Sequence, residues 1–551
     1  MSVDYVVPSM DIPVAVWHLA LAAGIGVSLG ALWRLDRPKG RWGLLARKRL
    51  VMGVPWGTLV AVIGVAGFYL LAQDGLANPR DPVVLPFRAW GYLYPTGILT
   101  AGFAHAGLGH VTGNLLGTLV FGSLAEYAWG HFPNERGVMS FSSLRTNPFA
   151  RIAAWVLGVF VAGVLSAMFA LGPIIGFSGV VFAFIGFALV RFPLATVAAT
   201  LLSDVISLLY NAIRFPTITR TARESFSRPW WADIAVQGHA LGLFLGVVLA
   251  AGLLYRRDVR PKATHVWLAA LVVAADRGLW AIYIIEGPET FTLYQALGTA
   301  LVFLVAALIA SGATATPRAF LASIDLSRRE AAYGLLLATL FALAVVAVPF
   351  NLFVVDDPSA GLESADPVEV GDYTVFYAEG VENQYISAVP FPSSEASSVN
   401  ASGVIVVSEQ RNVWWQEVSK SRLASRGDAT VRVGGLTWNE DVHATRTGWS
   451  LTGGESTYSV RLGVDGAERP VVFRDERATA DARIDGRNVS IAPADDDFDV
   501  IVTRNNETLG RAAIPENGTN TTAGGITFER DERDLFAERD DTRIRIARRS
   551  R

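Results

Sequence analysis

Cysteine is absent from this chain of 551 residues. Its absence excludes disulfide bonds, thiolate catalysis and metal sites with cysteine ligands. Charged residues are also scarce, at 18% of the chain, whereas hydrophobic residues make up 51%. Soluble globular proteins average about 25% charged residues. The composition is therefore too apolar for a soluble enzyme of this length, and it predicts a membrane protein.

The few charges are unevenly distributed along the chain. Residues 356–551 carry 34 acidic and 22 basic side chains, whereas residues 1–355 carry 16 acidic and 25 basic ones. Arginine far outnumbers lysine, and this bias, together with the acidic last part, resembles haloarchaeal proteins. We therefore expect a basic, apolar membrane part that is followed by an acidic, hydrophilic part.

Long apolar runs fill the first 355 residues. Most of them have about the 20 apolar residues that are needed to cross about 30 Å of hydrocarbon. The first run is not a signal peptide, because acidic residues precede it, basic residues follow it and its apolar core is too long. The predicted spans are 11–33, 51–72, 104–124, 152–172, 174–190, 193–212, 232–255, 265–286, 292–312 and 331–354.

Basic loops predict the orientation of these spans. The loops 34–49, 125–151, 256–263 and 313–330 are rich in arginine and lysine and all fall on one side. The positive-inside rule assigns that side to the cytoplasm, so we expect the N-terminus and the acidic last part to lie outside the cell membrane. The loop 213–231 departs from the rule, since it would be external and yet contains four arginines.

The acidic last part contains five Asn-X-Ser/Thr motifs, and the membrane part contains none. Such motifs are acceptors for N-glycosylation, which agrees with an external location. A polar segment rich in asparagine and threonine also produces them by chance. The five candidate acceptors are Asn400, Asn488, Asn506, Asn517 and Asn520.

Short β-rich runs recur in the acidic part at intervals of about 8–15 residues, with turn residues between them. The runs are Thr374–Tyr377, Gly403–Val407, Asn412–Val418, Thr430–Val433, Tyr458–Leu462, Pro470–Phe473 and Asp499–Val502. This spacing is typical of an all-β sandwich, so we expect a β-sandwich-like domain over 356–530. The dense charge of residues 531–551 predicts a charged tail that is solvated or disordered.

A serine interrupts the apolar part within Gly176-Phe177-Ser178-Gly179. Hydrocarbon penalises polar groups, which makes each one a candidate for function. Serines in membrane helices also often bond to their own helix or to a neighbouring one, and that explanation suffices for Ser178 on its own. However, the apolar run from Ser178 reaches Arg191 after 13 residues, about 20 Å of helix. We therefore expect this helix to begin inside the membrane, after a loop.

A histidine, His239, lies in the span 232–255. Gly242 and Gly246 follow it at helical spacing on the same face, and Gly179, Ala183 and Gly186 form a similar stripe after the serine. Small residues allow two helices to approach closely. The two stripes predict that Ser178 and His239 come within hydrogen-bond distance, as a nucleophile and a base require.

Two further polar residues, His110 and Asn114, are four positions apart in the span 104–124, and His105 precedes them. One helix face would offer two hydrogen-bond donors, which suits an oxyanion hole. A zinc-binding helix would need histidines at i and i+4 with a glutamate, and this segment does not match. We therefore expect no metal and no cofactor. A structural role, in bonds to neighbouring helices, is the alternative for His110 and Asn114.

These residues together resemble the rhomboid family of intramembrane serine proteases. The resemblance rests on three patterns: His105, His110 and Asn114 with their spacing, Gly176 to Gly179, and His239 with Gly242 and Gly246. Glu126 stands where rhomboids carry an acid at the end of their second core helix, and Phe182 stands where tyrosine is frequent. The family's Trp-Arg pair is absent from residues 86–104, and Gly238 replaces the usual alanine.

The resemblance implies an all-α polytopic membrane protein with a C-terminal external all-β domain. The six-helix rhomboid core would cover 51–255, after an N-terminal membrane helix and basic loop in 1–50 and before three additional membrane helices in 256–355. Transmembrane proteins would be its substrates and the lipid bilayer its surroundings, with no nucleic acid.

The resemblance also implies an activity and a role for each residue. Ser178 would be the nucleophile and His239 the general base of an intramembrane endopeptidase that cuts transmembrane substrates near the external face. His110 and Asn114 would bind the oxyanion. The supporting residues would be His105, Gly176, Gly179, Phe182, Gly242 and Gly246. Two alternatives are a catalytically inactive rhomboid-like scaffold, and a transporter that uses the charges of Asp276 and Arg277.

Overall fold

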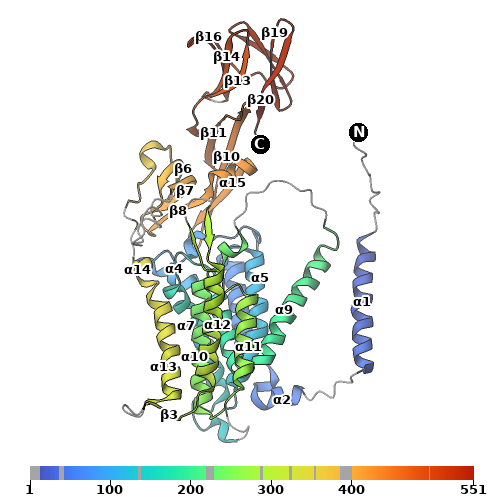
Figure 1. Cartoon of the computed structure of the whole chain (residues 1–551), viewed down its shortest axis with the longest axis vertical. Coiled ribbons are helices and arrows are strands. Elements are labelled where there is room, and N and C mark those ends of the chain that lie inside the picture. The colour runs from blue at the N-terminus through green and yellow to red at the C-terminus, as the bar shows by residue number, and fades with distance from the viewer. Residues whose placement is uncertain are drawn as a thin grey trace.

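A computed structural model of the chain describes residues 13–35, 42–133, 138–218, 229–285, 290–321, 326–352, 355, 357–384, 400–495 and 497–550. Figure 1 shows a bundle of helices that carries a β-rich part at one end. Some basic residues of the predicted loops lie outside the described residues, namely Arg37, Lys39, Arg41, Arg136, Arg220, Arg223 and Arg228.

The helices of the bundle follow the apolar runs of the sequence, and each predicted span overlaps a helix. In chain order they are α1 (Val14–Leu35), α2 (Trp42–Arg49), α3 (Trp56–Gly67), α4 (Pro95–Thr100), α5 (Leu108–Gly117), α6 (Ser123–Trp129), α7 (Pro148–Phe169), α8 (Ser178–Arg191), α9 (Pro193–Arg214), α10 (Val236–Arg256), α11 (Ala263–Asp276), α12 (Gln295–Thr314), α13 (Arg328–Val345) and α14 (Val348–Leu352). Single π-helical turns extend α3, through Phe68–Ala72, and join α5 to α6, through Thr118–Gly122.

Length and composition allow six of the described helices to cross a membrane by themselves. These are α1, α7, α9, α10, α12 and the segment Arg328–Leu352, which combines α13 and α14. Three shorter apolar helices of the bundle lie at Trp56–Ala72, Ser178–Arg191 and Ala263–Asp276. The chain is therefore a polytopic helical membrane protein in its first part.

Helix α8 is the centre of the bundle. All of its residues from Gly179 to Val190 are buried, and α10 is its most extensive neighbour. A helix that is apolar on every side is expected in such a position. In contrast, α1 has no buried residue, and α9 buries only residues of its first two turns. Figure 1 shows α9 leaning away from the bundle, toward α1.

The β-rich part contains three antiparallel sheets. One sheet has the order β5-β6-β7-β8, a second has the order β13-β14-β15-β16, and an eight-stranded sheet has the order β12-β11-β10-β20-β19-β18-β17 with β9 added to β10. The strands are β5 (Val368–Val370), β6 (Tyr373–Glu382), β7 (Asn400–Ser408), β8 (Val413–Ser419), β9 (Asp428–Gly434), β10 (Asn439–Leu451), β11 (Ser456–Val464), β12 (Val471–Arg474), β13 (Ala478–Ile484), β14 (Arg487–Pro493), β15 (Phe498–Arg504), β16 (Glu507–Ala513), β17 (Asn520–Ala523), β18 (Ile526–Asp531), β19 (Asp534–Arg539) and β20 (Thr542–Arg549).

The long strand β10 contributes to two of the separate hydrophobic cores of this part. Its first half pairs with β9, over a core that includes Tyr373 and Val404. Its last residues pair with β20, over a second core that includes Trp449 and Phe528. Each predicted β-run overlaps a strand, but a single sandwich over 356–530 is wrong, because the described strands enclose more than one hydrophobic core and extend to Arg549.

The prediction of a solvated or disordered tail over 531–551 is also wrong. Strands β19 and β20 cover most of it, and Leu535, Ala537, Ile546 and Ala547 are buried in the second core. In β20, the exposed Arg543 and Arg545 alternate with Ile544 and Ile546, which face the core. The dense charge conceals an alternation of period two, which is the pattern of a half-buried strand.

The β-rich part packs on the loop that precedes α4. Trp90 and Tyr94 of this loop belong to the same core as Tyr373 and Val404. Arg411 forms a two-pronged ion pair with Asp372, at 2.5 and 2.8 Å, and its Nη1 donates to the Tyr94 hydroxyl at 3.0 Å. The β-rich part is therefore attached to the end of the bundle at which α8 begins.

Candidate active site

Ser178 is the first residue of α8, directly after a loop that closes with Gly176. Gly176 has a φ of +128°, which L side chains rarely adopt. A Cβ at this position would lie 2.6 Å from His110 Cε1, and the Gly176 N–H donates to Ala101 O at 2.8 Å. Only glycine fits here, and it allows His110 to lie against the turn that presents the serine.

Close packing of α8 and α10 brings Ser178 and His239 together. Ser178 Oγ lies 2.9 Å from His239 Nε2. A Cβ on Gly242 would lie 2.1 Å from Gly179 O, and one on Gly246 would lie 1.9 Å from Ala183 O. The two backbones thus touch along the predicted stripes, and this contact sets the distance between the two side chains.

The His239 ring is held from one side by an aromatic ring. Phe182 stacks on it, with ring centroids 4.3 Å apart and planes 15° apart. Among the described residues, His239 Nδ1 has no hydrogen-bond partner. Within the described residues, no carboxylate bonds to His239, so Ser178 and His239 form a pair and not a triad with an acid. With the proton on Nδ1, the lone pair of Nε2 faces the serine hydroxyl, as a general base requires.

Asn114 is oriented by His105 rather than by the serine. Its Nδ2 lies 3.0 Å from His105 Nε2, and His105 Nδ1 lies 3.1 Å from Phe103 O. These contacts fit a histidine that donates from Nδ1 and accepts at Nε2. The Phe177 N–H also points to His105 Nε2, at 3.4 Å. His105 is therefore a support for Asn114 and for the residue that precedes Ser178.

A glutamine that the sequence analysis missed supports His105 in turn. Gln73 is fully buried; its Oε1 accepts from the His105 N–H, and its Nε2 donates to His105 O, both at 2.8 Å. Its Nε2 also donates to Val83 O at 2.8 Å. Gln73 carries no sequence signal, because its partners are backbone groups that are 10 and 32 residues away.

A small cavity of about 20 Å³ adjoins Ser178 and His239. Its other lining residues are Ser166, Ala170, Ile174, Ile175, Gly176, Gly179, Ala235 and Gly238. This volume holds about one water molecule. The residues around it are small or apolar, so the cavity suits a hydrolytic water or a small side chain.

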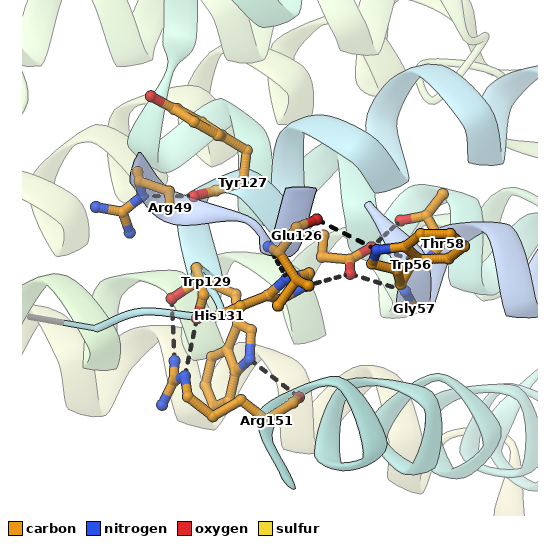
Figure 2. A network of polar contacts seen from close by, with 11 residues as sticks. Arg49, Trp56, Gly57, Thr58, Glu126, Tyr127, Trp129, His131 and Arg151 are labelled. Atoms are coloured by element: carbon orange, nitrogen blue, oxygen red, sulfur yellow. Dashed lines mark hydrogen bonds and ion pairs between the residues drawn. The ribbon is translucent and has the colours of Figure 1, made fainter. Parts of the chain in front are cut away.

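Glu126 lies in α6, which continues from α5 through the π-helical turn, and its side chain bonds α6 to α3 (Figure 2). Its Oε1 accepts from the Gly57 N–H at 2.8 Å and lies 2.7 Å from His131 Nε2. Its Oε2 accepts from the Thr58 N–H at 2.7 Å and from the Thr58 hydroxyl at 2.6 Å. These contacts satisfy the buried carboxylate and give Glu126 a structural role away from Ser178.

Arginines satisfy the carbonyls at the end of α6, beside this network (Figure 2). Arg49 donates to Tyr127 O at 2.9 Å and Ala128 O at 3.0 Å, and Arg151 donates to Trp129 O at 3.0 Å and Gly130 O at 2.8 Å. The last carbonyls of a helix lack partners within it, and cations are favourable there. These bonds hold the end of α6, and with it the continuous helical segment whose first part, α5, carries His110 and Asn114.

The two charges of the transporter alternative are engaged in contacts between helices. Arg277 Nη2 donates to Ser203 Oγ of α9 at 2.7 Å, and Arg277 Nε lies 2.9 Å from Asp276 Oδ2. The bond to Ser203 joins the end of α11 to α9. Such pairing is how membrane helices usually accommodate ionisable residues.

One comparison with known proteins gives a match. A family model described as the Rhomboid domain matches residues 92–256. The match begins just before α4 and ends with α10, and it contains His105, His110, Asn114, Ser178 and His239. No curated protein and no solved structure matches the chain. Helices α11 to α14 and the β-rich part lie outside the matched region.

Proposed function

Because the chain belongs to the rhomboid family, we propose that it is an intramembrane serine endopeptidase that hydrolyses transmembrane proteins near the external face of the membrane. The family includes both proteases and inactive relatives, so the proposal depends on the site. The observation that carries it is the 2.9 Å distance between Ser178 Oγ and His239 Nε2 at a small cavity. An inactive scaffold has no need of this arrangement.

In the proposed reaction, His239 Nε2 takes the proton of the Ser178 hydroxyl as Oγ attacks a substrate carbonyl. The tetrahedral intermediate collapses when His239 gives this proton to the leaving amine, and an acyl-enzyme remains. Water then attacks the ester while His239 takes one of its protons, and His239 gives this proton to Ser178 Oγ as the bond between the acyl carbon and Oγ breaks, so that the acid and free Ser178 are released. The side chains of Ser178 and His239 perform both halves of this cycle.

The oxyanion would be stabilised by His110, Asn114 and the Ser178 N–H. His110 lies against Gly176, two residues before the nucleophile, and Asn114 is held by His105. Fixed donors that meet the developing charge contribute strongly in a water-poor site, and the loss of one typically costs about 10²–10³ in turnover. The long contact of 3.5 Å from the Ala106 N–H to His110 Nδ1 supports a proton on the Nε2 of His110.

A transmembrane helix would have to unwind near its end to present a peptide bond to Ser178. Small residues at the scissile bond fit the cavity of about 20 Å³. The basic loops at the opposite end of the bundle support a cytoplasmic location there, with Ser178, the N-terminus and the β-rich part toward the external side. Asn400, Asn506, Asn517 and Asn520 are exposed and Asn488 is half-buried, so most of the candidate glycosylation sites are accessible.

Labelling with a fluorophosphonate probe tests the nucleophile. The wild-type chain in lipid vesicles should form one adduct, on Ser178, and His239→Ala should slow its formation more than about 10²-fold because the base is lost. Ser166 lines the same cavity, so Ser166→Ala is a matched control that should still be labelled. An adduct that persists in Ser178→Ala at the wild-type rate would refute the proposal.

A further inference from the structure

Asn351 of α14 bonds to the end of α7, although it lies far beyond the matched region. Its side chain is buried, with 4% of the residue exposed. Its Nδ2 donates to Met168 O at 2.9 Å and to Ala170 O at 3.0 Å, and its backbone carbonyl accepts from the Tyr92 N–H at 2.8 Å. Asn351 thus joins α14 both to α7 and to the loop before α4.

The carbonyls of Met168 and Ala170 lie at the C-terminal end of α7, where the helix itself supplies no N–H donors. Helix α7 ends at Phe169, and the last four carbonyls of a helix lack intrahelical donors. Both N–H groups of the Asn351 carboxamide are used for them, and the Tyr92 hydroxyl adds a bond to Met168 O at 2.8 Å. The direction in which the chain leaves α7 is therefore set by Asn351.

Gln237 makes the corresponding link from α10, two residues before His239. Its Oε1 accepts from the Leu171 N–H at 2.9 Å, and its Nε2 donates to Phe169 O at 2.8 Å and to Leu343 O of α13 at 2.6 Å. One side chain therefore connects α7, α10 and α13. Helix α10, through Gln237, and helix α14, through Asn351, therefore both bond to the same four-residue segment, 168–171.

This segment leads directly into the site. Ala170, an acceptor of the Asn351 bond, lines the cavity beside Ser178 and His239. The loop that follows Ala170 contains Gly176 and ends at Ser178. A shift of the end of α7 would move this loop relative to α10, and errors of about 1 Å in position can cost about 10²-fold in rate.

We propose that Asn351 is a positioning residue for Ser178 and His239, so that α13 and α14 complete a catalytic unit that the Rhomboid domain does not contain by itself. Asn351 fixes the loop that carries the nucleophile, and Gln237 ties the helix that carries the base to the same point. This inference rests on the proposed protease function.

The test compares full-length variants in lipid vesicles on a model transmembrane substrate. Asn351→Leu keeps the number and branching of the side-chain heavy atoms but removes both donors. It should lower kcat and the rate of fluorophosphonate labelling by about 10- to 100-fold, while KM stays within about twofold. Tyr333→Phe is the matched control, because it removes a bond of 3.3 Å between α13 and Val248 O of α10. It should leave both rates unchanged, since this bond lies away from the 168–171 segment.

Each outcome decides the proposal. Wild-type kcat and labelling in Asn351→Leu would overturn it, and so would an equal loss in Tyr333→Phe, which would indicate only a loosened helix. If Asn351→Leu does not fold, Asn351→Ser, which keeps one donor, should give an intermediate loss of kcat, and an unchanged kcat there would be equally contrary. A wild-type chain that neither cleaves nor labels overturns the protease proposal as well, whereas an active wild type with an equally active Asn351→Leu overturns this inference only.

Discussion

At the scale of single residues, the geometry of the site depends on glycines. Gly176 has a positive φ and lies where any Cβ would press on the His110 ring. Two separate costs of a substitution, backbone strain and displacement of His110, therefore fall on one position. The neighbouring Gly172 also has a positive φ, of +76°, but has nothing within 4 Å of its Cβ position.

This contrast gives a prediction for two alanine variants. Gly176→Ala should lower the rate of fluorophosphonate labelling by about 10²-fold or more, because it displaces His110, the proposed oxyanion donor, as well as the serine turn. Gly172→Ala should retain most of that rate, since it bears the backbone strain only. Equal losses in both variants would show that strain, and not the His110 contact, controls the site.

Sequence patterns point to the residues of the proposed reaction but not to those that orient them. The spacing of His110 and Asn114 follows from a helix, and the glycine stripe after His239 follows from close helix packing. Gln73, Gln237 and Asn351 bond to backbone groups of distant segments. A bond to the main chain imposes no residue type on its partner, so no sequence pattern could reveal these three.

At the scale of elements, α8 and α10 are held at backbone contact. The Cβ position of Gly242 lies 2.1 Å from Gly179 O, and that of Gly186 lies 2.1 Å from Leu243 O. Neither contact can yield by rotating a side chain, because the obstacle in each case is main chain. The separation of these two helices is consequently the quantity that fixes the distance between Ser178 and His239.

Gly242→Ala should therefore reduce both stability and activity. Overpacking typically costs about 1–3 kcal/mol, and the helices would separate on the side of the dyad. Thermal unfolding and substrate cleavage measure the two effects. Gly158 of α7 has nothing within 4 Å of its Cβ position, so Gly158→Ala is the control and should keep both properties. Full cleavage by Gly242→Ala would contradict the packing argument.

The apolar runs predicted the helices well, because each run must cross the same thickness of hydrocarbon. Strands β19 and β20 could not be predicted in the same way. Their buried residues, such as Leu535 and Ile546, alternate with charges in a segment whose overall composition indicates solvation. The division of the β-rich part into separate cores also depends on the length of β10, which pairs with β9 near its start and with β20 near its end.

At the scale of the whole molecule, an ion pair supports the junction between the β-rich part and the bundle. Burial raises the pKa of Asp372, but hydrogen bonds from Arg411 and Ser408 and the charge of Arg411 outweigh it, so the pKa lies below its ordinary value. Because the folded pKa is lower than the unfolded pKa, the carboxylate stabilises the folded state above the unfolded value of about 3.9. This contribution is lost as the pH falls through the folded value.

The wild-type chain should therefore lose stability below about pH 4 more steeply than Asp372→Asn does. Melting temperatures measured by tryptophan fluorescence between about pH 3 and pH 6 give the two slopes, and Trp90 reports on the junction because it lies in the shared core. At neutral pH, Asp372→Asn should be the less stable protein. Parallel slopes for the two proteins would show that Asp372 does not couple the junction to pH.

The attachment of the β-rich part also makes the two ends of the helix bundle different from each other. The serine end of the bundle carries this part through Trp90, Tyr94 and Arg411, and the opposite end carries the arginines that cap α6. Asn351 and Gln237 bind the added helices α13 and α14 to α7 and α10, so these helices adjoin the loops around Ser178. The proposed catalytic unit thus extends beyond the matched domain.

Cleavage of a transmembrane substrate in lipid vesicles tests the central claim most directly. The rate at which a new N-terminus forms in the substrate should fall to background in Ser178→Ala and in His239→Ala, whereas Ser166→Ala should retain cleavage at the same peptide bond. Product formed at the wild-type rate by Ser178→Ala or His239→Ala would contradict the account.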